Sequence, residues 1–423
     1  MKFELIIPPN PYLGDDKRNP PLGLLYIASK VERDGTKVRV SDLRGKDLGE
    51  LENIIGNADV YGITASTPDY LTAKEIAFKI KSKNYKSKII IGGIHATSVP
   101  NEIDKIFDKV VIGEGEQIIS KILKDINKGD KTRFYQDSPI ENLDEIPFPA
   151  YHLIPFESAF SKNAFEVGGE PAAAVITSRG CPYSCSFCAS RKMWPGKVRF
   201  RSTSNVINEV NWLKKDYGIK NFRFQDDTMT FDYKKIKSLC EELAPLEIKW
   251  RAATRVDKIS LEVLKSMKNS GCEEIAFGVE SLCQDALDKV GKRVEVSDFY
   301  KAMNISKEAG LKTRLYFIIG LPGEAPGFAD RLIKFTQETN PDGIDVSTLV
   351  PYPGSDIYHH PEKYGIVIKP ENFSKYNMTL GMKEGEIDRP FTFIHDILSE
   401  NELKYERKIA LEYVKSRKMV LNF

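Results

Sequence analysis

Residues 172–188 read AAAVITSRGCPYSCSFC, a short apolar run followed at once by three closely spaced cysteines. The apolar part, Ala173–Thr177, has the length of a buried strand. Cys181, Cys185 and Cys188 follow in the loop after it, with the spacing C-x3-C-x2-C. In folds built from parallel strands, the loops at the carboxyl ends of the strands carry the active site. We therefore expect this stretch to open a β/α domain and to hold its reactive groups.

Downstream of this stretch, short apolar runs alternate with amphipathic segments through residues 172–350. The predicted strands are Ala173–Thr177, Phe222–Gln225, Ile248–Ala252, Glu274–Val279, Thr313–Ile319 and Gly343–Leu349. The predicted helices include Asn205–Tyr217, Tyr233–Leu243, Leu261–Ser270, Val296–Ala309 and Ala329–Glu338. Since about eight such units close a complete barrel of the triosephosphate isomerase (TIM) type, this shorter series predicts a partial (β/α)6 barrel.

Residues 1–128 also alternate between apolar runs and segments with helical periodicity. The predicted strands are Phe3–Ile7, Lys37–Val40, Val60–Ile63, Lys88–Ile91 and Lys109–Ile112. The predicted helices are Gly23–Arg33, Leu48–Ile55, Ala73–Lys81 and Glu116–Ile126. This order predicts a doubly wound, Rossmann-like parallel sheet, so both domains are of the α/β class.

Several of these strands end in glycines, prolines or hydroxyl residues. The exits are Pro8–Asn19, Thr64–Thr67, Gly92–Gly93 and Gly113–Glu116. Each of them on its own is an ordinary turn sequence. Because the carboxyl ends of parallel strands meet at one edge of the sheet, the exits together favour a binding site there.

The remaining segments are a linker and a C-terminal region. Residues 129–171 contain five prolines and no strong periodicity, so we expect an extended linker between the two domains. Residues 351–423 are mixed in character and end in a charged amphipathic helix, about Glu402–Lys418. We interpret this C-terminal region as a lid or a packing element.

Composition narrows the classes of function. The 423 residues include 62 Lys and Arg against 60 Asp and Glu, so the charge gives no reason to expect nucleic acid or an acidic membrane as partner. No apolar run approaches the roughly 20 residues of a membrane span, and the apolar part of the start MKFELIIPPN is too short for a signal peptide. We therefore expect a cytoplasmic protein, in which clustered cysteines indicate metal binding or catalysis instead of disulfides.

A cluster of three cysteines limits the metals that fit. A structural zinc site needs four ligands, which normally come as pairs of Cys or His. The other cysteines, Cys240, Cys272 and Cys283, are scattered and form no second pair. A 4Fe–4S cluster also takes four ligands, but with three thiolates it keeps one iron open for a substrate or cofactor. The ligand count therefore favours an open-site 4Fe–4S cluster over zinc.

The cysteine spacing, with Phe187 before the last cysteine, resembles the radical S-adenosylmethionine (SAM) enzymes. Further segments resemble this family in the same order, each at the end of a predicted strand: 224–230 FQDDTMT, 250–255 WRAATR, 278–281 GVES and 317–324 FIIGLPGE. The resemblance implies that Cys181, Cys185 and Cys188 ligate a 4Fe–4S cluster whose open iron is chelated by SAM. In the family, reduction of the cluster cleaves SAM to methionine and a 5′-deoxyadenosyl radical, which abstracts hydrogen from an unactivated position.

The resemblance also implies contacts to SAM. Phe187 is expected to contact adenine through its backbone, and Glu280 and Arg255 sit where polar groups hold the ribose or the amino acid end. Ile319 and Leu321 are expected to pack on adenine, with the barrel core as an equal alternative. For Glu280 the functional interpretation is favoured, since a charged residue is seldom buried in a strand without a partner.

Residues 1–128 resemble the N-terminal domain of the cobalamin-binding subgroup of radical SAM enzymes. The segments that carry the resemblance are 20–24 PPLGL, 91–97 IGGIHAT and 111–116 VIGEGE. The subgroup places a corrinoid over the strand ends, with its nucleotide tail in the sheet edge. We expect hydroxyl groups there to contact cobalamin, and glycines to let the backbone approach it closely. The candidates are Ser66, Thr67, Gly92, Gly93, Gly113, Glu114 and Gly115.

The sequence departs from the many cobalamin proteins that bind cobalt through the His of a D-x-H-x-x-G motif after the first strand. The loop Pro8–Asn19 contains no His, and the first His of the chain is His95. We therefore expect cobalamin to bind without a His lower ligand, as is usual in this subgroup, with Tyr12 and Leu13 as candidates for its lower face. His95 follows the fourth strand and is interpreted as a tail-pocket or structural residue.

The pairing of the two domains makes a cobalamin-dependent radical SAM methyltransferase, acting on an unactivated carbon, the leading hypothesis. The alternative keeps both cofactors but forms or contracts a ring, or rearranges its substrate oxidatively, without methyl transfer. A corrinoid sensor and a first domain that has lost cobalamin are weaker alternatives. The expected substrate is a small molecule or lipid precursor, and the expected partner is an electron donor such as flavodoxin or ferredoxin.

Overall fold

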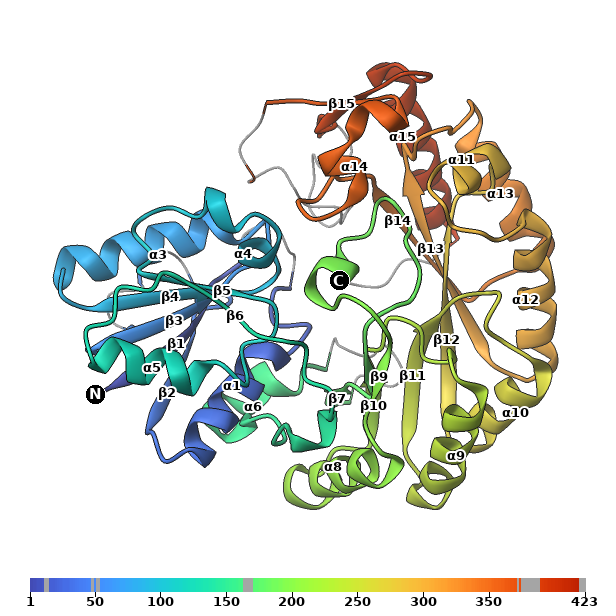
Figure 1. The fold of residues 1–423 in the computed structure, drawn as a ribbon. Helices are drawn as coiled ribbons and strands as arrows, with labels where there is room; N and C mark the ends of the chain where they lie inside the picture. The colour runs from blue at the N-terminus through green and yellow to red at the C-terminus, as the bar shows by residue number, and fades with distance from the viewer. Residues whose placement is uncertain are drawn as a thin grey trace.

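The computed structural model describes residues 1–10, 15–46, 49–50, 54–162, 170–370, 373 and 389–417. Within these residues the chain forms two six-stranded sheets and two small two-stranded sheets. Figure 1 shows the first large sheet with its helices on one side of the molecule and the second, curved sheet on the other. The chain is therefore α/β, as predicted.

The first sheet has the strand order β2-β1-β3-β4-β5-β6, and all of its strands are parallel. Its strands are β1 (Phe3–Ile7), β2 (Val38–Asp42), β3 (Val60–Thr64), β4 (Lys88–Gly92), β5 (Lys109–Ile112) and β6 (Phe134–Gln136). This arrangement confirms the doubly wound sheet. The last strand lies in the segment expected to be a linker. This strand has only three residues, and only Tyr135 is buried. It is therefore too short to show an alternation of apolar and polar residues that could be recognised from the sequence.

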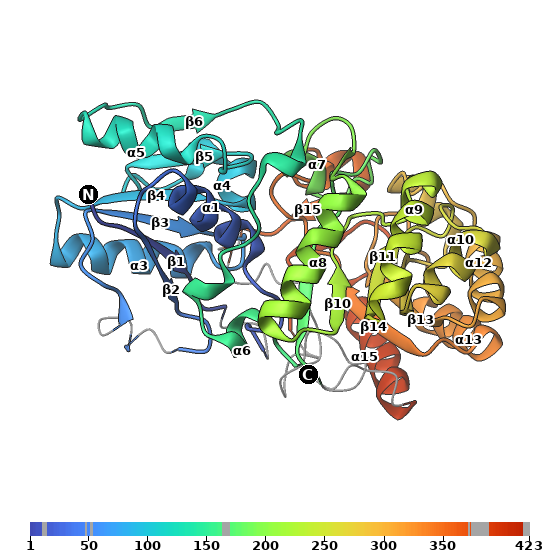
Figure 2. The ribbon, with the colours of Figure 1, turned by 90° about the horizontal axis from the view of Figure 1, so that it is seen from below.

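Helices cover both faces of the first sheet. They are α1 (Leu22–Arg33), α3 (Tyr70–Lys83), α4 (Ile94–Ser98) and α5 (Ile119–Asn127), with the 3₁₀ turn η1 (Pro100–Glu102). Figure 2 shows α3 on one face and α1 and α5 on the other. Alternate residues of β1 follow this division, because Ile6 packs in the core under α3 while Leu5 and Ile7 pack in the core under α1. Half of the helix predicted over Leu48–Ile55 lies outside the described residues.

The second sheet is a partial barrel with the strand order β14-β13-β12-β11-β10-β7, again all parallel. Its strands are β7 (Ala172–Val175), β10 (Asn221–Phe224), β11 (Lys249–Thr254), β12 (Cys272–Glu280), β13 (Lys312–Ile319) and β14 (Gly343–Thr348). The helices on its convex side are α8 (Thr203–Tyr217), α9 (Tyr233–Leu243), α10 (Leu261–Asn269), α11 (Gln284–Lys289), α12 (Val296–Glu308) and α13 (Phe328–Thr339), with the turn η4 (Ala244–Leu246). This arrangement confirms the partial barrel.

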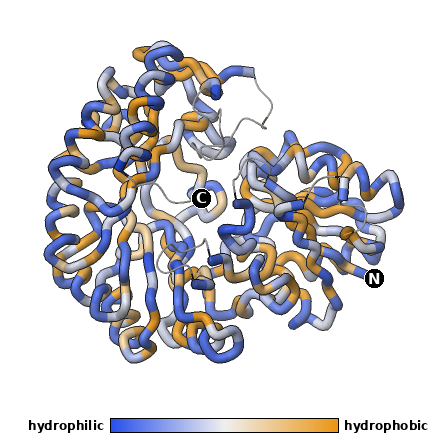
Figure 3. The backbone as a smooth tube through the Cα atoms, turned by 180° about the vertical axis from the view of Figure 1, so that it is seen from behind, coloured by the Kyte–Doolittle hydropathy of each residue, from blue (hydrophilic) through white to orange (hydrophobic). Residues whose placement is uncertain are grey.

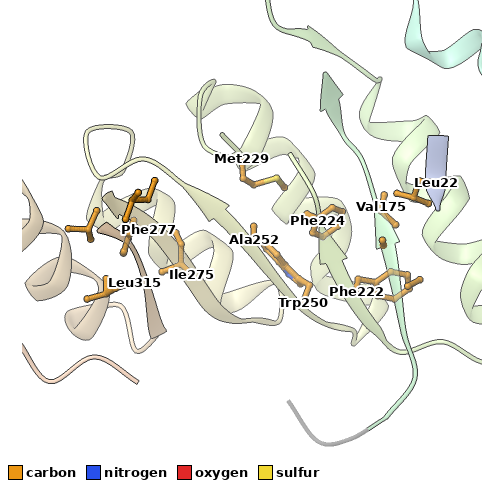
Figure 4. Packing of buried hydrophobic residues seen from close by; sticks show 14 of the residues in the cluster. Leu22, Val175, Phe222, Phe224, Met229, Trp250, Ala252, Ile275, Phe277 and Leu315 are labelled. Carbon is orange, nitrogen blue, oxygen red and sulfur yellow. The ribbon is translucent and has the colours of Figure 1, made fainter. Parts of the chain in front are cut away.

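The barrel strands alternate between apolar and polar side chains. Figure 4 shows the apolar set, which includes Phe222, Phe224, Trp250 and Ile275, packed together in the hydrophobic core. The residues between them on the same strands are polar or small. Hydropathy also alternates along the outer helices (Figure 3), as expected for elements with one buried face. The polar residues of the strands therefore belong to the concave side of the barrel.

The connection between the two large sheets contains η2 (Leu143–Glu145), η3 (Tyr151–Leu153) and α6 (Phe156–Ala159). Tyr151 is buried, and its hydroxyl donates to the carbonyl of Ala174 at 3.1 Å. The same hydrophobic core includes the α1 face of the first sheet, Tyr151, Phe160 and the barrel. The two large sheets are therefore joined by a continuous core as well as by the chain.

The C-terminal region packs against the barrel. It contains α14 (Asp356–His359), η5 (Pro361–Tyr364), an antiparallel pair of β15 (Ile366–Ile368) and β16 (Phe393–His395), and α15 (Glu400–Ser416). The last helix lies against α13, as Figure 1 shows. Among the described residues, no helix combines the length and the apolarity that a membrane crossing requires.

Candidate functional site

The three clustered cysteines lie in the connection of a small hairpin at the carboxyl end of β7. The hairpin pairs β8 (Ser178–Arg179) with β9 (Arg199–Phe200), and the connection also contains the single turn α7 (Ser190–Met193). Ser186, between the second and third cysteine, is held by two backbone hydrogen bonds. Its N–H donates to the carbonyl of Val290 at 2.9 Å, and its carbonyl accepts from Ile357 at 3.0 Å. Segments far apart in sequence thus fix the loop.

Each cysteine sulfur has a polar neighbour, which comes from the barrel mouth for Cys181 and Cys185 and from the same connection for Cys188. The contacts are Cys181 Sγ to Thr228 Oγ1 at 3.8 Å, Cys185 Sγ to Arg255 Nη1 at 3.9 Å, and Cys188 Sγ to the Ser190 N–H at 3.4 Å. Burial raises the pKa of the Cys185 thiol, against the pull of the nearby Lys292 and Arg255 charges. Each of the two cations also has a carboxylate partner, Glu280 for Lys292 and Asp257 for Arg255.

The described residues contain no group of three or more His, Cys, Asp or Glu side chains that converge on a single metal ion. A mononuclear zinc site needs such convergence, with each sulfur about 2.3 Å from the metal. In a 4Fe–4S cluster each thiolate binds a different iron, so the sulfurs need not meet at one point. Three thiols on one short loop match the ligand count of a 4Fe–4S cluster that keeps one iron open.

Arg255 and Glu280 lie beside Cys185 and are linked through Lys292. The guanidinium of Arg255 stacks on the Tyr183 ring at 3.7 Å from its centroid and donates to the carbonyl of Lys292 at 2.7 Å. The ammonium of Lys292 donates to Glu280 Oε1 at 2.8 Å. The two candidate SAM contacts are thus brought together around the cysteine loop by Lys292, which sequence reasoning did not single out.

Glu280 also has an unusual backbone. Its φ is +65°, and the register between β12 and β13 shifts at this point. For a residue other than glycine such a conformation costs of order 1–3 kcal/mol and is found most often at functional sites. The positive φ changes the direction of the chain at the end of β12, where the Glu280 carboxylate accepts the hydrogen bond from Lys292.

The apolar candidates differ in their accessibility. Phe187 is half-buried and packs against the barrel core. Ile319 and Leu321 are only 1% and 0% exposed, and the carbonyl of Leu321 lies 2.9 Å from His395 Nε2. This burial favours the alternative interpretation, in which Ile319 and Leu321 are part of the barrel core.

A cavity of about 320 Å³ lies at the carboxyl edge of the first sheet and is called the first-sheet cavity below. Its wall includes Gly92, Gly93, Gly113, Glu114 and Gly115 from the predicted set. The barrel completes it with Ile176, Arg179, Met193, Trp194 and Gln225. The glycine-rich exits are thus brought together, and they face the cysteine domain.

Gly93 illustrates why glycine is needed at this edge. Its φ is +96°, and a Cβ atom there would lie 2.7 Å from the carbonyl oxygen of Ala65. A side chain at this position would therefore push β4 away from the exit of β3. The glycine lets two strand ends approach each other behind the cavity.

Ser66 and Thr67, two further candidates, are not part of the wall of the first-sheet cavity as described, where Thr64 lies instead. The hydroxyl of Ser66 donates to Asp69 at 2.5 Å, and the hydroxyl of Thr67 lies 3.2 Å from His95 Nδ1. Tyr12 and Leu13 lie outside the described residues. The structure thus places the glycines of the strand exits in the wall of one cavity, whereas Ser66 and Thr67 are not among the residues that line it.

His95 is fully buried beside the cavity wall. Its ring stacks on Tyr70 with the centroids 4.2 Å apart, and its Nε2 has no hydrogen-bond partner among the described residues. Burial lowers its pKa to about 4. Since His95 packs in the core and does not line the first-sheet cavity, it is a structural residue here.

Glu114 was expected to contact cobalamin, but its carboxylate is bound by the barrel. It accepts from Arg179 Nη1 at 2.7 Å and from Arg199 Nη1 at 2.7 Å, while Glu116 accepts from Arg179 Nη2 at 2.7 Å. All four side chains are at least 93% buried. Although burial acts to raise the pKa of Glu114, the two arginines hold it below its ordinary value. We call this group the interdomain clamp.

A second cavity of about 340 Å³ opens on the concave side of the barrel and is called the barrel cavity. Its wall includes Arg223, Arg251, Asp226 and Tyr316 from the barrel and Asn19 from the first domain. Gln225 lines both this cavity and the first-sheet cavity. The cavity at the edge of the first sheet and the cavity in the barrel therefore lie next to each other, with the Gln225 side chain between them.

Comparisons with known proteins agree with this geometry. The model of the Radical SAM superfamily matches residues 175–335, and that of the B12 binding domain matches residues 17–123. An uncharacterized methyltransferase of Pyrococcus horikoshii is 32% identical over 389 residues, which cover 85% of this chain and 83% of the relative. The anaerobic magnesium-protoporphyrin IX monomethyl ester cyclase of Rubrivivax gelatinosus is 28% identical, over 93% of this chain and 75% of the relative.

Solved structures share the fold over most of the chain. The radical SAM methyltransferase TsrM from Kitasatospora setae, with cobalamin and a 4Fe–4S cluster bound, aligns with a TM-score of 0.68 at 16% identity, over 90% of this chain and 79% of its own. The cobalamin-dependent radical SAM enzyme OxsB, with aqua-cobalamin and SAM bound, aligns with a TM-score of 0.65 at 18% identity, over 98% of this chain and 61% of its own. The matched domains imply a 4Fe–4S cluster, SAM and cobalamin as cofactors. The chain belongs to the radical SAM superfamily, as a cobalamin-dependent enzyme with an N-terminal B12-binding domain.

Proposed function

We propose that the protein methylates an unactivated carbon of a small molecule or lipid precursor. The observation that carries this proposal is the apposition of the first-sheet cavity and the barrel cavity across Gln225. A methyl carrier in one domain and a hydrogen-abstracting centre in the other need such a shared space. The 32% identical relative named as a methyltransferase supports the same reaction.

The proposal assigns roles to residues around the barrel mouth. Cys181, Cys185 and Cys188 hold the 4Fe–4S cluster, which supplies the electron that cleaves SAM when both are bound. Arg255 and Glu280, beside Cys185, orient the polar parts of SAM. Phe187 borders the adenine side, while Ile319 and Leu321 stay in the barrel core. A reductant such as flavodoxin or ferredoxin supplies the electron.

The first domain is proposed to bind cobalamin without a His lower ligand. The nucleotide tail would enter the first-sheet cavity, whose walls of Gly92, Gly113 and Gly115 leave room for it. His95 supports this proposal, because its ring is buried against Tyr70 and is not among the residues that line the cavity. The cobalt(II) form of the bound cofactor should therefore show no nitrogen superhyperfine coupling in its electron paramagnetic resonance spectrum. A nitrogen coupling would contradict the proposal.

We also propose a functional division of the chain into a cobalamin domain (1–128), a linker (129–171), a radical SAM domain (172–350) and a C-terminal region (351–423). The linker contributes β6 to the first sheet. The C-terminal region contacts the cysteine loop through the hydrogen bond from Ile357 to Ser186. This contact supports a packing role for the C-terminal region at the site.

The test of methyl transfer uses SAM with a deuterated methyl group. Reconstituted protein with cobalamin and a reductant is incubated with an anaerobic small-molecule extract of its source, and products are analysed by mass spectrometry. The expected result is a small molecule that gains the labelled methyl group. 5′-Deoxyadenosine and S-adenosylhomocysteine should form in similar amounts, because two SAM molecules are used per turnover.

The second candidate function is ring formation or rearrangement without methyl transfer. It is favoured by the cyclase relative, which is 28% identical over 93% of this chain. The same experiment separates the two reactions. If 5′-deoxyadenosine accumulates with loss of a substrate, and neither S-adenosylhomocysteine nor labelled product appears, the methyltransferase proposal is wrong and the cyclase candidate replaces it.

A further inference from the structure

The concave side of the barrel carries a layer of buried charge below its mouth. Arg223 of β10 is paired in register with Arg251 of β11, and Arg251 with Glu274 of β12. Arg314 of β13 lies in the same layer, since its Nε donates to Glu274 at 3.0 Å. A layer of this kind is unusual, because barrel interiors are mostly filled by branched apolar side chains.

Most of this charge is neutralised within the layer. Glu274 accepts from Arg251 at 3.1 Å and from Arg314, and Arg314 also donates to Asp345 at 3.2 Å. Among the described residues, two carboxylates thus pair with these two guanidiniums. Arg223 lies beside this group and adds a third positive charge to it.

The described contact of Arg223 is with a neutral group. Its Nη1 donates to the amide oxygen of Asn19 at 2.6 Å. Burial, and then the charge of Arg251, lower the pKa of Arg223 to about 10 despite Tyr316 and Asp345 nearby. A half-buried guanidinium beside a second one, with no carboxylate of the described residues at hydrogen-bond distance, is costly unless an anion joins it.

The remaining carboxyl group in the wall of the barrel cavity does not fill this role. Asp226 accepts from the hydroxyls of Thr177 and Ser178 at 2.7 and 2.5 Å and from the Thr177 N–H at 3.2 Å. Burial raises its pKa, which disfavours its charged form. The balance of charge in the cavity therefore stays positive at Arg223.

We propose that the barrel cavity binds an oxyanion group of the substrate, a carboxylate or a phosphate, through the guanidinium of Arg223 with Arg251 beside it. The planar fork of a guanidinium matches either group with two parallel hydrogen bonds. This inference rests on the proposed function, in which the barrel cavity receives the substrate. Its first consequence is a substrate class: an acid, anchored at its charged end.

The position of Arg223 sets the orientation of that substrate. Arg223 lies within β10, two residues before Gln225, which borders the first-sheet cavity. The cysteine loop lies at the carboxyl ends of the strands, above this layer. The charged end of the substrate therefore sits deepest in the barrel, and the rest of it extends towards the cysteine loop and the first domain.

The test measures anion binding, so it needs no turnover and no identified substrate. Calorimetry on the cluster-loaded full chain is run with inorganic phosphate and with acetate, against chloride at equal ionic strength. The wild type should bind phosphate or acetate, and the preferred probe tells a phosphate from a carboxylate. Arg223→Met should weaken that binding at least tenfold, and Arg223→Lys should restore part of it, because lysine keeps the charge without the fork.

Arg417→Met is the matched control. Arg417 also donates to an asparagine amide oxygen, that of Asn340 at 3.4 Å, but it is exposed at the end of α15. Its replacement should leave anion binding unchanged. Equal binding by wild type and Arg223→Met, or equal loss in Arg417→Met, would overturn the proposal.

A second measurement covers the chance that Arg223→Met changes the fold. Without added anion, this variant should unfold at a higher temperature than the wild type, because it removes a half-buried cation that no described carboxylate pairs with. A lower unfolding temperature would contradict the proposal. Complete loss of phosphate binding on saturation with SAM would also overturn it, because the anion site would then belong to SAM. Neither outcome depends on whether the methyl label is transferred.

Discussion

The first-sheet cavity and the barrel cavity meet at Gln225 but differ in how their charged walls are balanced. In the first-sheet cavity, Glu114 and Glu116 are paired with Arg179, so the protein neutralises its own charges. In the barrel cavity, Arg223 faces the neutral amide of Asn19. The first cavity is built to take a ligand by shape and backbone contact, and the second to take one by charge.

This difference follows from where each charge sits in the chain. The acidic pair follows β5 and meets arginines of the cysteine hairpin, so charge is used to lock two domains together. The arginine of β10 lies on the concave side of the barrel, in register with Ala174 of β7 and Arg251 of β11, and its described hydrogen bond goes to Asn19 of the first domain. The predictions below test each side of the comparison in turn, starting with the cysteine loop between the two cavities.

The largest effect is expected from the cysteine loop. Changing Cys181, Cys185 or Cys188 to Ala should abolish cluster assembly, because a 4Fe–4S cluster that keeps one iron open depends on three thiolates. Iron content after anaerobic reconstitution should fall from about four per chain to near zero. Cys240→Ala and Cys283→Ala are the controls and should keep their iron. Equal loss in all five variants would show that the loop is not the cluster site.

The next largest effect is expected at the interdomain clamp. Arg179→Met leaves the carboxylates of Glu114 and Glu116 buried with part of their pairing removed, which should lower the free energy of unfolding by about 3–5 kcal/mol. Urea unfolding at pH 7 measures the loss. Lys197→Met, on the same hairpin, removes a pair whose side chains are 73% and 70% exposed and should cost less than about 1 kcal/mol. Similar losses in both variants would mean that the clamp does not stabilise the domain contact.

The clamp also marks the limit of prediction from the sequence. Apart from β6, the strands of both large sheets were predictable because each buries a continuous or alternating apolar run, as in Ile89–Ile91 or Phe222–Phe224. The pairing of Glu114 with Arg199 spans 85 residues and two domains, and no local pattern reports such a contact. The only available signal was the pair of arginines flanking the cysteine loop, at 179 and 199.

The hydroxyl pair shows a second limit. Ser66 and Thr67 follow a strand whose exit does face the first-sheet cavity, and Thr64 lines it. The hydroxyls turn instead to Asp69 and His95, because the chain bends into α3 directly after the strand. Strand exits can be read from sequence, but the direction of each side chain in a turn depends on packing that the sequence does not display.

A smaller effect is expected from pH at His95, which is buried and does not line the first-sheet cavity. Burial lowers its folded pKa to about 4, against 6.5 for the free side chain. The unfolded chain therefore takes up the proton first, so the stability that neutral His95 provides is complete above pH 6.5 and is lost as pH falls towards 4. The loss amounts to about 3 kcal/mol at 25 °C.

This prediction is measured as a difference between variants, which cancels the other titrating groups. Urea unfolding of the wild type and of His95→Phe is compared at several pH values between 7 and 4. The variant should lose less stability on acidification than the wild type. His152→Phe is the control, because His152 is exposed and pairs with Glu32 at 3.0 Å. A parallel fall for wild type and His95→Phe would show that His95 is not buried as a neutral ring.

The smallest effect on the protein itself is expected from Gly92→Val, which changes the shape of the first-sheet cavity and no charge. A Cβ at Gly92 would meet only Val111, at an ordinary contact distance of 3.6 Å, so the fold should accept the side chain. The added methyl groups then occupy space that Gly92 leaves open in the wall. Affinity for cobalamin, measured by equilibrium dialysis, should fall at least tenfold while iron content and the unfolding temperature stay unchanged.

Gly49→Val, at an exposed glycine with no neighbour within 4 Å, should bind cobalamin like the wild type. Arg223→Met should do the same, since the barrel cavity selects by charge and lies beyond Gln225. If Gly92→Val binds cobalamin normally, or if Arg223→Met loses it, the two cavities do not divide the ligands in the way that their walls indicate.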